Sequence, residues 1–189
     1  MTELEKYIHD YFLVSPDDCK KVSTMFKTET LKKGDYFLHT GKYCNKLAFI
    51  RQGILRVYVN LPESEVTQWI GTDGYFITDI HSFLSRQPSR FQIQALTDTH
   101  LYTIDHEQYL AMSSILPKWN ELEKLFIVKC FVMLENRVFD LISMPAEARY
   151  KKFFDQNREL FNQVPLQYIA SMLGMTPETF SRIRRKMIS

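Results

Sequence analysis

Residues 165–186 read PLQYIASMLGMTPETFSRIRRK. Apolar residues recur in this stretch at helical spacing, in one group before Gly174 and in a second group after it. A glycine between the groups can end the first helix, because a helix C-terminus often needs a residue at positive φ. Thr176 can then cap a second helix, and Pro177 suits its first position, where the backbone needs no N–H partner. The stretch therefore predicts two helices joined by a tight turn.

The second of these helices is expected to have an apolar face and a polar face. The apolar face consists of Phe180, Ile183 and Met187, and the small Ala170 lets the first helix come close to it. The opposite face carries Glu178, Ser181, Arg182 and Arg185. A helix-turn-helix presents such a polar face to the major groove, where arginine pairs with guanine and glutamate accepts a hydrogen bond from cytosine. A small helical hairpin with a basic tail is the alternative interpretation.

The charge of the chain is distributed unevenly. The formal net charge is +2 over 189 residues. Residues 145–189 contain eight lysines and arginines against four acids, a net charge of +4, so residues 1–144 carry the difference of −2. This asymmetry favours a polyanion as the partner of the C-terminal part.

Several classes of protein and site find no support in the sequence. Cys19, Cys44 and Cys130 lack the spacing of a metal site or a disulfide framework, which indicates a reducing compartment. Residues 2–10 are charged, so we expect no export signal, and residues 125–134 form an apolar run too short to span a bilayer. No nucleophile has a plausible base, and no glycine-rich loop could hold a phosphate. We therefore expect a cytoplasmic protein that is not an enzyme and needs no membrane, metal or cofactor.

The pattern of a β domain begins near Glu29. Stretches rich in β-branched and aromatic residues alternate with turn signals and cover residues 36–39, 47–51, 55–59, 65–70, 91–95 and 100–104. Many short strands at this spacing predict a sandwich or jelly roll. Leu55–Val59 alternates strictly, so its leucine and its two valines are expected to face the core. Short helices are expected within residues 2–26, with Ser15 as one cap, and within residues 78–89.

The longest helical pattern covers residues 117–143, with Pro117 at its start and Pro145 just past its end. Two apolar seams run along it in steps of three and four residues. One seam comprises Leu125, Val128, Val132, Phe139 and Ile142, and the other comprises Ile127, Phe131, Leu134, Val138 and Leu141. One seam could cover the β domain while the other pairs with a second copy in a parallel dimer. The alternative is a helix buried on two sides within one monomer.

The order of these elements resembles the CRP/FNR family of bacterial transcription regulators over nearly the whole chain. The most specific motif is Glu-Thr-Phe-Ser-Arg at residues 178–182, which resembles the recognition signature of that family. The resemblance implies an α+β fold with an N-terminal double-stranded β-helix, or jelly roll, like that of cyclic-nucleotide-binding domains. It divides the chain into a sensor domain (residues 1–116), a dimerisation helix (residues 117–143) and a helix-turn-helix domain (residues 145–189).

The same resemblance implies specific DNA contacts. Base edges would be contacted by Glu178, Ser181 and Arg182, and phosphates by Thr176, Thr179, Arg184, Arg185 and Lys186. A homodimer would read a palindromic operator with two recognition helices about 34 Å apart, and RNA polymerase is a further implied partner. The chain ends about a dozen residues into the second helix, whereas family members continue into a two-stranded wing, so we expect fewer phosphate contacts.

The candidate effector pocket departs from the family pattern. Members that bind cyclic nucleotides hold the ribose and the phosphate with a Gly-Glu pair and an Arg-Ser pair, whereas this chain has Thr78-Asp79 and Ser89-Arg90. The candidate pocket residues are Arg56, Thr78, Asp79, Ser89 and Arg90. We therefore expect an unknown small-molecule effector rather than cyclic AMP or cyclic GMP, with Arg90 bending back to an anion as the alternative. The scattered cysteines also differ from the clustered set of the iron–sulfur members.

The sequence leaves two functions open. The first is a dimeric transcription regulator whose β-roll senses a ligand and shifts the long helix, which changes the spacing of the recognition helices. The second is a ligand-sensing or protein-binding module with a vestigial helix-turn-helix. The shortened C-terminus favours the second function, and the retained Glu178, Ser181 and Arg182 favour the first.

Overall fold

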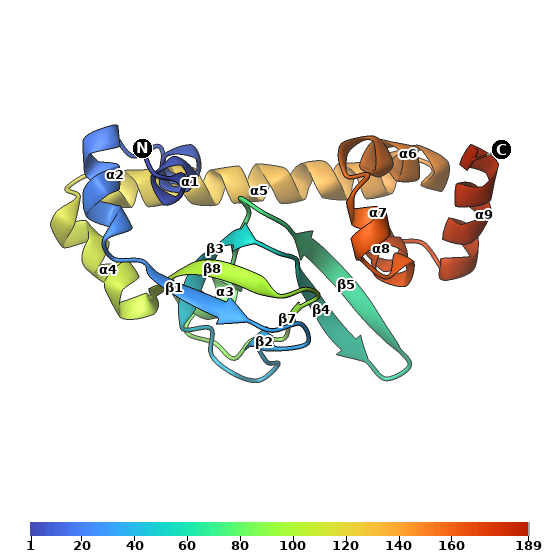
Figure 1. Cartoon of the computed structure of the whole chain (residues 1–189), viewed down its shortest axis with the longest axis horizontal. Coiled ribbons are helices and arrows are strands. Elements are labelled where there is room, and N and C mark those ends of the chain that lie inside the picture. Colours follow the sequence, from blue (N-terminus) through green and yellow to red (C-terminus); the bar gives the residue numbers. More distant parts are fainter. Residues whose placement is uncertain (189) are drawn as a thin grey trace. The chain divides into compact units, whose positions relative to one another are not determined.

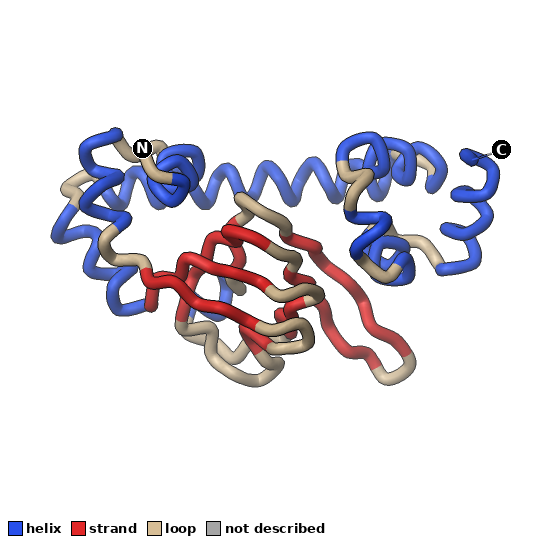
Figure 2. The backbone as a smooth tube through the Cα atoms, viewed as in Figure 1, coloured by secondary structure: helices blue, strands red, loops and turns tan. Residues whose placement is uncertain are grey.

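The structure is a computed structural model that describes residues 1–188. The chain divides into two compact units. The first comprises residues 1–57 and 71–130, and the second comprises residues 58–70 together with the chain from residue 131. Strands occupy the middle of the sequence, with one short helix among them and further helices before and after; Figure 2 shows the helices in blue and the strands in red. The fold class is therefore α+β, as the sequence predicts.

Within the described residues, the strands form two four-stranded sheets that make a β-sandwich (Figure 1). The strand order in the first sheet is β1 (Lys27–Leu31), β8 (Thr99–Asp105), β3 (Lys46–Gln52) and β6 (Phe76–Ile77). The order in the second sheet is β2 (Tyr36–Leu38), β7 (Gln92–Ala95), β4 (Leu55–Leu61) and β5 (Ser64–Gly71). The pairs β1–β8, β3–β8, β3–β6 and β2–β7 are antiparallel, which agrees with the sandwich expected from many short strands.

Two strands were not predicted from the sequence. β1 reads KTETL, and within this strand Leu31 is the buried residue, while β6 has two residues. Neither strand has the apolar alternation on which a prediction depends. Both strands are held in the sheet by pairing with a longer strand: β1 pairs with β8, and β6 pairs with β3. The other strands, β2, β3, β4, β5, β7 and β8, confirm the six predicted stretches within one or two residues at their ends.

The expected burial of β4 is wrong in two respects. Leu55 and Val57 are buried as predicted, but Val59, also expected in the core, is half-buried. Arg56 and Tyr58, which alternate with these residues, are buried too, at 1% and 3% exposure. Both faces of β4 are therefore covered between Leu55 and Tyr58, and a strand covered on both faces buries polar and apolar side chains alike. Alternation of residue type therefore does not report burial here.

The N-terminal helices are those that the sequence predicts. α1 (Glu3–Phe12) begins with a capping box, in which the Thr2 hydroxyl accepts a hydrogen bond from the Glu5 amide at 3.2 Å. α2 (Pro16–Ser23) is capped by Ser15. The remaining helices of the first unit are α3 (Ile80–Ser85), expected within residues 78–89, and α4 (His106–Ile115), which was not predicted.

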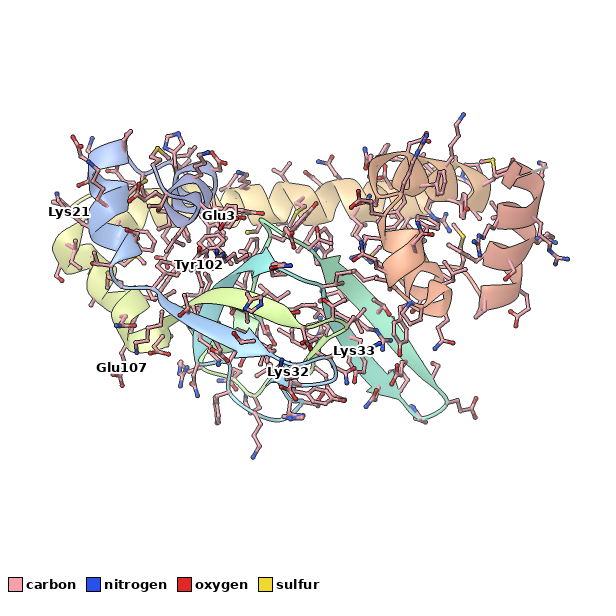
Figure 3. The ribbon with its side chains drawn as sticks, in the orientation of Figure 1. Glu3, Lys21, Lys32, Lys33, Tyr102 and Glu107 are labelled. Atoms are coloured by element: carbon pink, nitrogen blue, oxygen red, sulfur yellow. The ribbon has the colours of Figure 1, made fainter. Side chains whose placement is uncertain are left out.

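Side-chain contacts join α1 to the rest of the first unit. The Glu3 carboxylate accepts a hydrogen bond from the Tyr102 hydroxyl of β8 at 3.3 Å, and both residues are labelled in Figure 3. The same carboxylate lies 3.4 Å from the Arg51 Nε atom. Phe12 packs against Trp119 and Phe126 of α5 with ring centroids 5.2 and 4.5 Å apart. α1 therefore lies against both the first sheet and the N-terminal part of α5 (Figure 1).

The expected packing of the long helix, α5 (Trp119–Ser143), is wrong. Its buried residues are Trp119, Phe126 and Cys130, which belong to neither of the two expected seams. Leu125, Val128, Val132, Phe139 and Ile142 are all exposed, and so are most residues of the second seam. The sequence pattern predicted that one of the seams packs against the β domain. Instead, aromatic residues at the start of the helix make this contact. A broad apolar surface is left uncovered.

The second unit contains four helices within the described residues: α6 (Ala146–Gln156), α7 (Leu160–Gln163), α8 (Leu166–Met172) and α9 (Pro177–Ile188). Their core is aromatic. Tyr150 lies with its ring centroid 5.6 Å from that of Phe161 and 5.1 Å from that of Phe180. Phe154 packs edge-to-face on Phe161 at 4.9 Å. This cluster, with about 0.5–1.5 kcal/mol per aromatic pair beyond area burial, holds α6, α7 and α9 together.

Candidate functional site

The turn between α8 and α9 has the geometry that the sequence predicts. Gly174 has a φ of +66°, a conformation that glycine adopts without steric cost. The Met175 amide donates to the carbonyl of Ala170 at 2.9 Å and closes the turn. The Thr176 hydroxyl accepts a hydrogen bond from the Thr179 amide at 3.2 Å, so Thr176 caps α9. Short-range chemistry therefore sets the angle between the two helices.

The two faces of α9 agree with the prediction except at Met187, which was expected on the apolar face and is 41% exposed. Phe180 is 1% exposed, and Ile183 and Ala170 are buried with it. The side chains on the opposite face are exposed: Glu178, Ser181, Arg182, Arg185 and Lys186. Thr179 and Arg184 are half-buried. Because the apolar face is sealed against α6 and α7, the polar face must point to solvent.

Two acidic groups influence the charge at this helix. Hydrogen bonds from its own backbone N–H and from the Thr176 side chain hold the pKa of Glu178 below its usual value. Glu178 is therefore an acceptor at neutral pH. Lys186 pairs with the Glu147 carboxylate of α6 at 3.0 Å, with both side chains exposed. An exposed pair of this kind contributes about 0–1 kcal/mol, so Lys186 can exchange it for another anion.

Arg149, counted above among the basic residues of the C-terminal part, serves inside the fold. Its Nε atom donates to the carbonyl of Leu173 at 3.0 Å, directly after α8. Its Nη1 atom donates to the carbonyls of Met144 at 2.6 Å and Leu141 at 3.5 Å, around the end of α5. Its Nη2 atom donates to Gly174 at 3.4 Å. The guanidinium thus satisfies carbonyls at two helix C-termini, which need partners of this kind.

The candidate effector residues Thr78, Asp79 and Ser89 lie together and bond to one another or to the nearby backbone. The Asp79 carboxylate caps α3 by accepting from the Ser82 amide at 3.2 Å, and it accepts from the Ser89 hydroxyl at 2.6 Å. The Ser89 hydroxyl also accepts from the Phe91 amide at 3.0 Å. Thr78 donates to the carbonyl of Lys46 at 3.2 Å. Asp79 and Ser89 are both buried, so the polar groups of this cluster bond to one another and to the nearby backbone.

The two candidate arginines, Arg56 and Arg90, differ in burial. Arg90 is exposed, and its guanidinium lies over the Phe91 ring at 4.8 Å. Arg56 is buried and has interactions of its own. The Asp79 carboxylate therefore occupies the Ser89 hydroxyl, and Arg90 of the Ser89-Arg90 pair lies at the surface.

Other classes of site receive little support. Cys19, Cys44 and Cys130 are free and buried, and burial raises the pKa of the Cys130 thiol to about 11. In the part of the chain that the structure describes, no group of three histidine, cysteine, aspartate or glutamate side chains could hold a metal ion. Nor, among residues 1–188, does any helix combine the length and apolarity needed to cross a membrane.

The sequence did not identify the contacts of the β4–β5 hairpin with the C-terminal helices. Arg137 lies in α5 and is half-buried. It donates to carbonyl oxygens of both the hairpin and α8, at Gln68 and Met172. The sequence feature that could have indicated these contacts is an arginine in the middle of an apolar helix, because a buried charge requires hydrogen-bond partners. Its partners are 69 and 35 residues away, so the spacing of nearby residues could not identify them.

Comparisons with known proteins were consistent with this fold. The sequence profile of the cyclic nucleotide-binding domain matches residues 28–114. FixK2 from Bradyrhizobium japonicum is similar in structure with a TM-score of 0.73 and 16% identity, over 86% of this chain and 84% of that chain. CLP, a c-di-GMP-responsive global regulator of Xanthomonas campestris, is similar with a TM-score of 0.69 and 14% identity, over 92% and 91%.

The catabolite activator protein of Thermus thermophilus is a further similar structure, with a TM-score of 0.58 and 19% identity, over 96% of this chain and 86% of that chain. No curated protein matches the sequence. At these identities the structural likeness establishes the fold, and the function must be argued from the residues themselves.

Proposed function

We propose, from the premise that residues 28–114 belong to the cyclic nucleotide-binding domain family and that the structural neighbours are CRP/FNR regulators, that this protein is a dimeric DNA-binding transcription regulator. One observation carries the proposal. α9 presents Glu178, Ser181 and Arg182 to solvent while Phe180 and Ile183 seal its opposite face. This is the arrangement that a recognition helix needs.

The α8–α9 pair supports a helix-turn-helix in this role. The first helix and the turn hold the second helix by its apolar face, and the N-terminal half of α9 is then free to enter the major groove. Arg182 can pair with O6 and N7 of guanine, and Glu178, kept ionised by a lowered pKa, can accept from the cytosine amino group. Thr176 and Thr179, at the start of α9, are placed to contact phosphates through hydroxyl and backbone N–H groups.

The dimer is supported by the uncovered surface of α5. Leu125, Val128, Val132, Phe139 and Ile142 are all at least 43% exposed in the single chain. An apolar face of this length on a helix indicates a partner surface. A second copy with its α5 parallel to the first would cover it, and the two recognition helices would then address one palindrome.

The effector is proposed to be something other than cyclic AMP or cyclic GMP. Asp79 and Ser89 bond to each other, and Arg90 lies in solvent over Phe91. We expect either nucleotide at 1 mM to leave the melting temperature of the protein unchanged. A ligand at 100 times its Kd would stabilise the fold by about 2.7 kcal/mol, which corresponds to several degrees.

A thermal melt with and without nucleotide measures this. Adenosine at the same concentration is the matched control, because it has the base and the ribose without the phosphate. An increase of several degrees with cyclic AMP alone, lost in Arg90→Ala, would contradict the expectation and show that Arg90 turns back to hold the phosphate.

The experiment that tests the function is selection of binding sites from random duplex DNA, followed by a titration of the selected site. We expect a palindrome with two half-sites one helical turn apart, bound by a dimer, with an affinity that falls steeply with salt. A folded dimer that enriches no sequence at low salt would leave the protein-binding module with a vestigial helix-turn-helix as the better account.

A further inference from the structure

The β4–β5 hairpin is attached to the α8–α9 pair. Residues 58–70, which form the outer part of this hairpin, belong to the same compact unit as α6 to α9. The Thr67 amide of β5 donates to the Ser171 hydroxyl of α8 at 2.9 Å. The same hydroxyl lies 3.4 Å from the carbonyl oxygen of Glu65 and donates to it. The Ser171 hydroxyl thus accepts one hydrogen bond from the backbone of β5 and donates another to it.

Arg137 makes the second and stronger part of this attachment. Its Nη1 atom donates to the carbonyl of Gln68 in β5, and its Nη2 atom donates to the carbonyl of Met172, the last residue of α8, at 2.9 Å. Its guanidinium also lies over the Trp69 ring at 5.4 Å. A planar guanidinium can serve two carbonyls and a ring together, and an ammonium cannot reproduce that geometry.

The cost of burying Arg137 indicates that these contacts matter. Burial lowers the pKa of its guanidinium, the direction expected when a charge loses water. A buried charge is retained only where hydrogen bonds compensate it.

We propose that Arg137 and Ser171 are positioning residues for DNA recognition, which fasten the β4–β5 hairpin to the C-terminal end of α8 and thereby fix the direction of α9. This inference rests on the proposed DNA-binding function. Met172 is two residues before Gly174, so the contacts act directly before the turn that sets the angle of α9. The strands of the hairpin continue to Leu55 and Gly71 in the first unit.

The test uses Arg137→Lys, which keeps the charge of the protein, with Ser171→Ala as an independent variant. Arg158→Lys is the matched control, since Arg158 is an exposed arginine of the same unit, paired with Asp155 at 3.8 Å. Hydrogen–deuterium exchange of peptides within residues 58–70 is measured on the full chain without DNA. Binding to the selected palindrome and to random duplex is measured on the same preparations.

In Arg137→Lys we expect residues 58–70 to exchange at least about tenfold faster, because hydrogen bonds to a charged donor are lost. Affinity for the palindrome is expected to fall about tenfold, while affinity for random DNA and its salt dependence stay as in the parent, since the charge is unchanged. Ser171→Ala should show the same changes to a smaller degree. Arg158→Lys should show neither.

The outcomes separate the two proposals. If the parent protein selects no DNA sequence, the proposed function fails, yet exchange in the hairpin still reports whether Arg137 and Ser171 hold it. Unchanged exchange of residues 58–70 in both variants would overturn the attachment. Faster exchange with an unchanged ratio of specific to random binding would overturn the positioning role. An equal loss of both affinities, with a melting temperature lowered by several degrees, would mean that Arg137 is needed only for folding.

Discussion

Replacing Phe139 with glutamate is expected to convert the dimer into a monomer. Phe139 is 67% exposed in the single chain, on the seam that we assign to the dimer interface. Burying such a side chain contributes about 1.5–3 kcal/mol, and two-fold symmetry counts it twice. The loss of about 3–6 kcal/mol corresponds to a dissociation constant raised about a hundredfold to ten-thousandfold. The new carboxylates would also face an apolar surface.

Sedimentation equilibrium over a range of protein concentrations measures this change. Asn136→Glu is the control, because it adds the same charge at an exposed polar position three residues earlier in α5. The control should remain dimeric and keep its affinity for the palindrome, whereas Phe139→Glu should lose both. A dimer that withstands Phe139→Glu would place the interface elsewhere and contradict the parallel pairing of α5.

Replacing Arg182 with alanine is expected to remove discrimination at one base pair of each half-site. A bidentate contact between arginine and guanine is worth about 1–3 kcal/mol, and the dimer loses one in each half-site, so affinity for the selected palindrome should fall about thirtyfold to ten-thousandfold. Affinity for random DNA should change little. Arg182 is exposed, so the melting temperature of the variant should match that of the parent.

Lys186→Ala is the comparison that separates recognition of bases from electrostatic attraction to the DNA backbone. Lys186 is exposed and pairs with Glu147 in the free protein, and its proposed DNA contact is a phosphate. Its loss should weaken all sequences about equally and, because each subunit of the dimer loses one phosphate contact, reduce the slope of log affinity against log salt by about two. Competition titrations at several salt concentrations measure both effects. If Arg182→Ala behaved like Lys186→Ala, α9 would be an electrostatic surface and not a reader of bases.

The features predicted correctly from the sequence are those fixed by near neighbours. Gly174 at positive φ, the Thr176 cap and the buried Phe180 all depend on residues within a few positions. The six regular strands were recognised for the same reason, since β-branched and aromatic residues alternate with glycine turns. The departure at Ser89-Arg90 was also visible, and the exposed Arg90 agrees with it.

The features that escaped prediction depend on partners far along the chain. Arg56 interrupts a pattern that assigned it to solvent, and it is buried because its strand is covered on both sides. Arg137 and Arg149 look like surface charges in the sequence, yet their carbonyl partners include Gln68 and Leu173, which local spacing does not connect to them. The inner face of α5 was missed although its buried residues, Trp119, Phe126 and Cys130, follow helical spacing, because the two longer apolar seams dominate the pattern.

The fourfold use of Arg149 has a mechanical consequence. A single rigid, planar cation spans the final turn of α5 and the bend that precedes α9, with hydrogen bonds between 2.6 and 3.5 Å to both. If one segment rotated against the other, these hydrogen bonds would break. Carbonyl oxygens at the negative ends of two helix dipoles would then lose their partner. We therefore expect a twist at the end of the long helix to reach the turn between α8 and α9 through this one side chain.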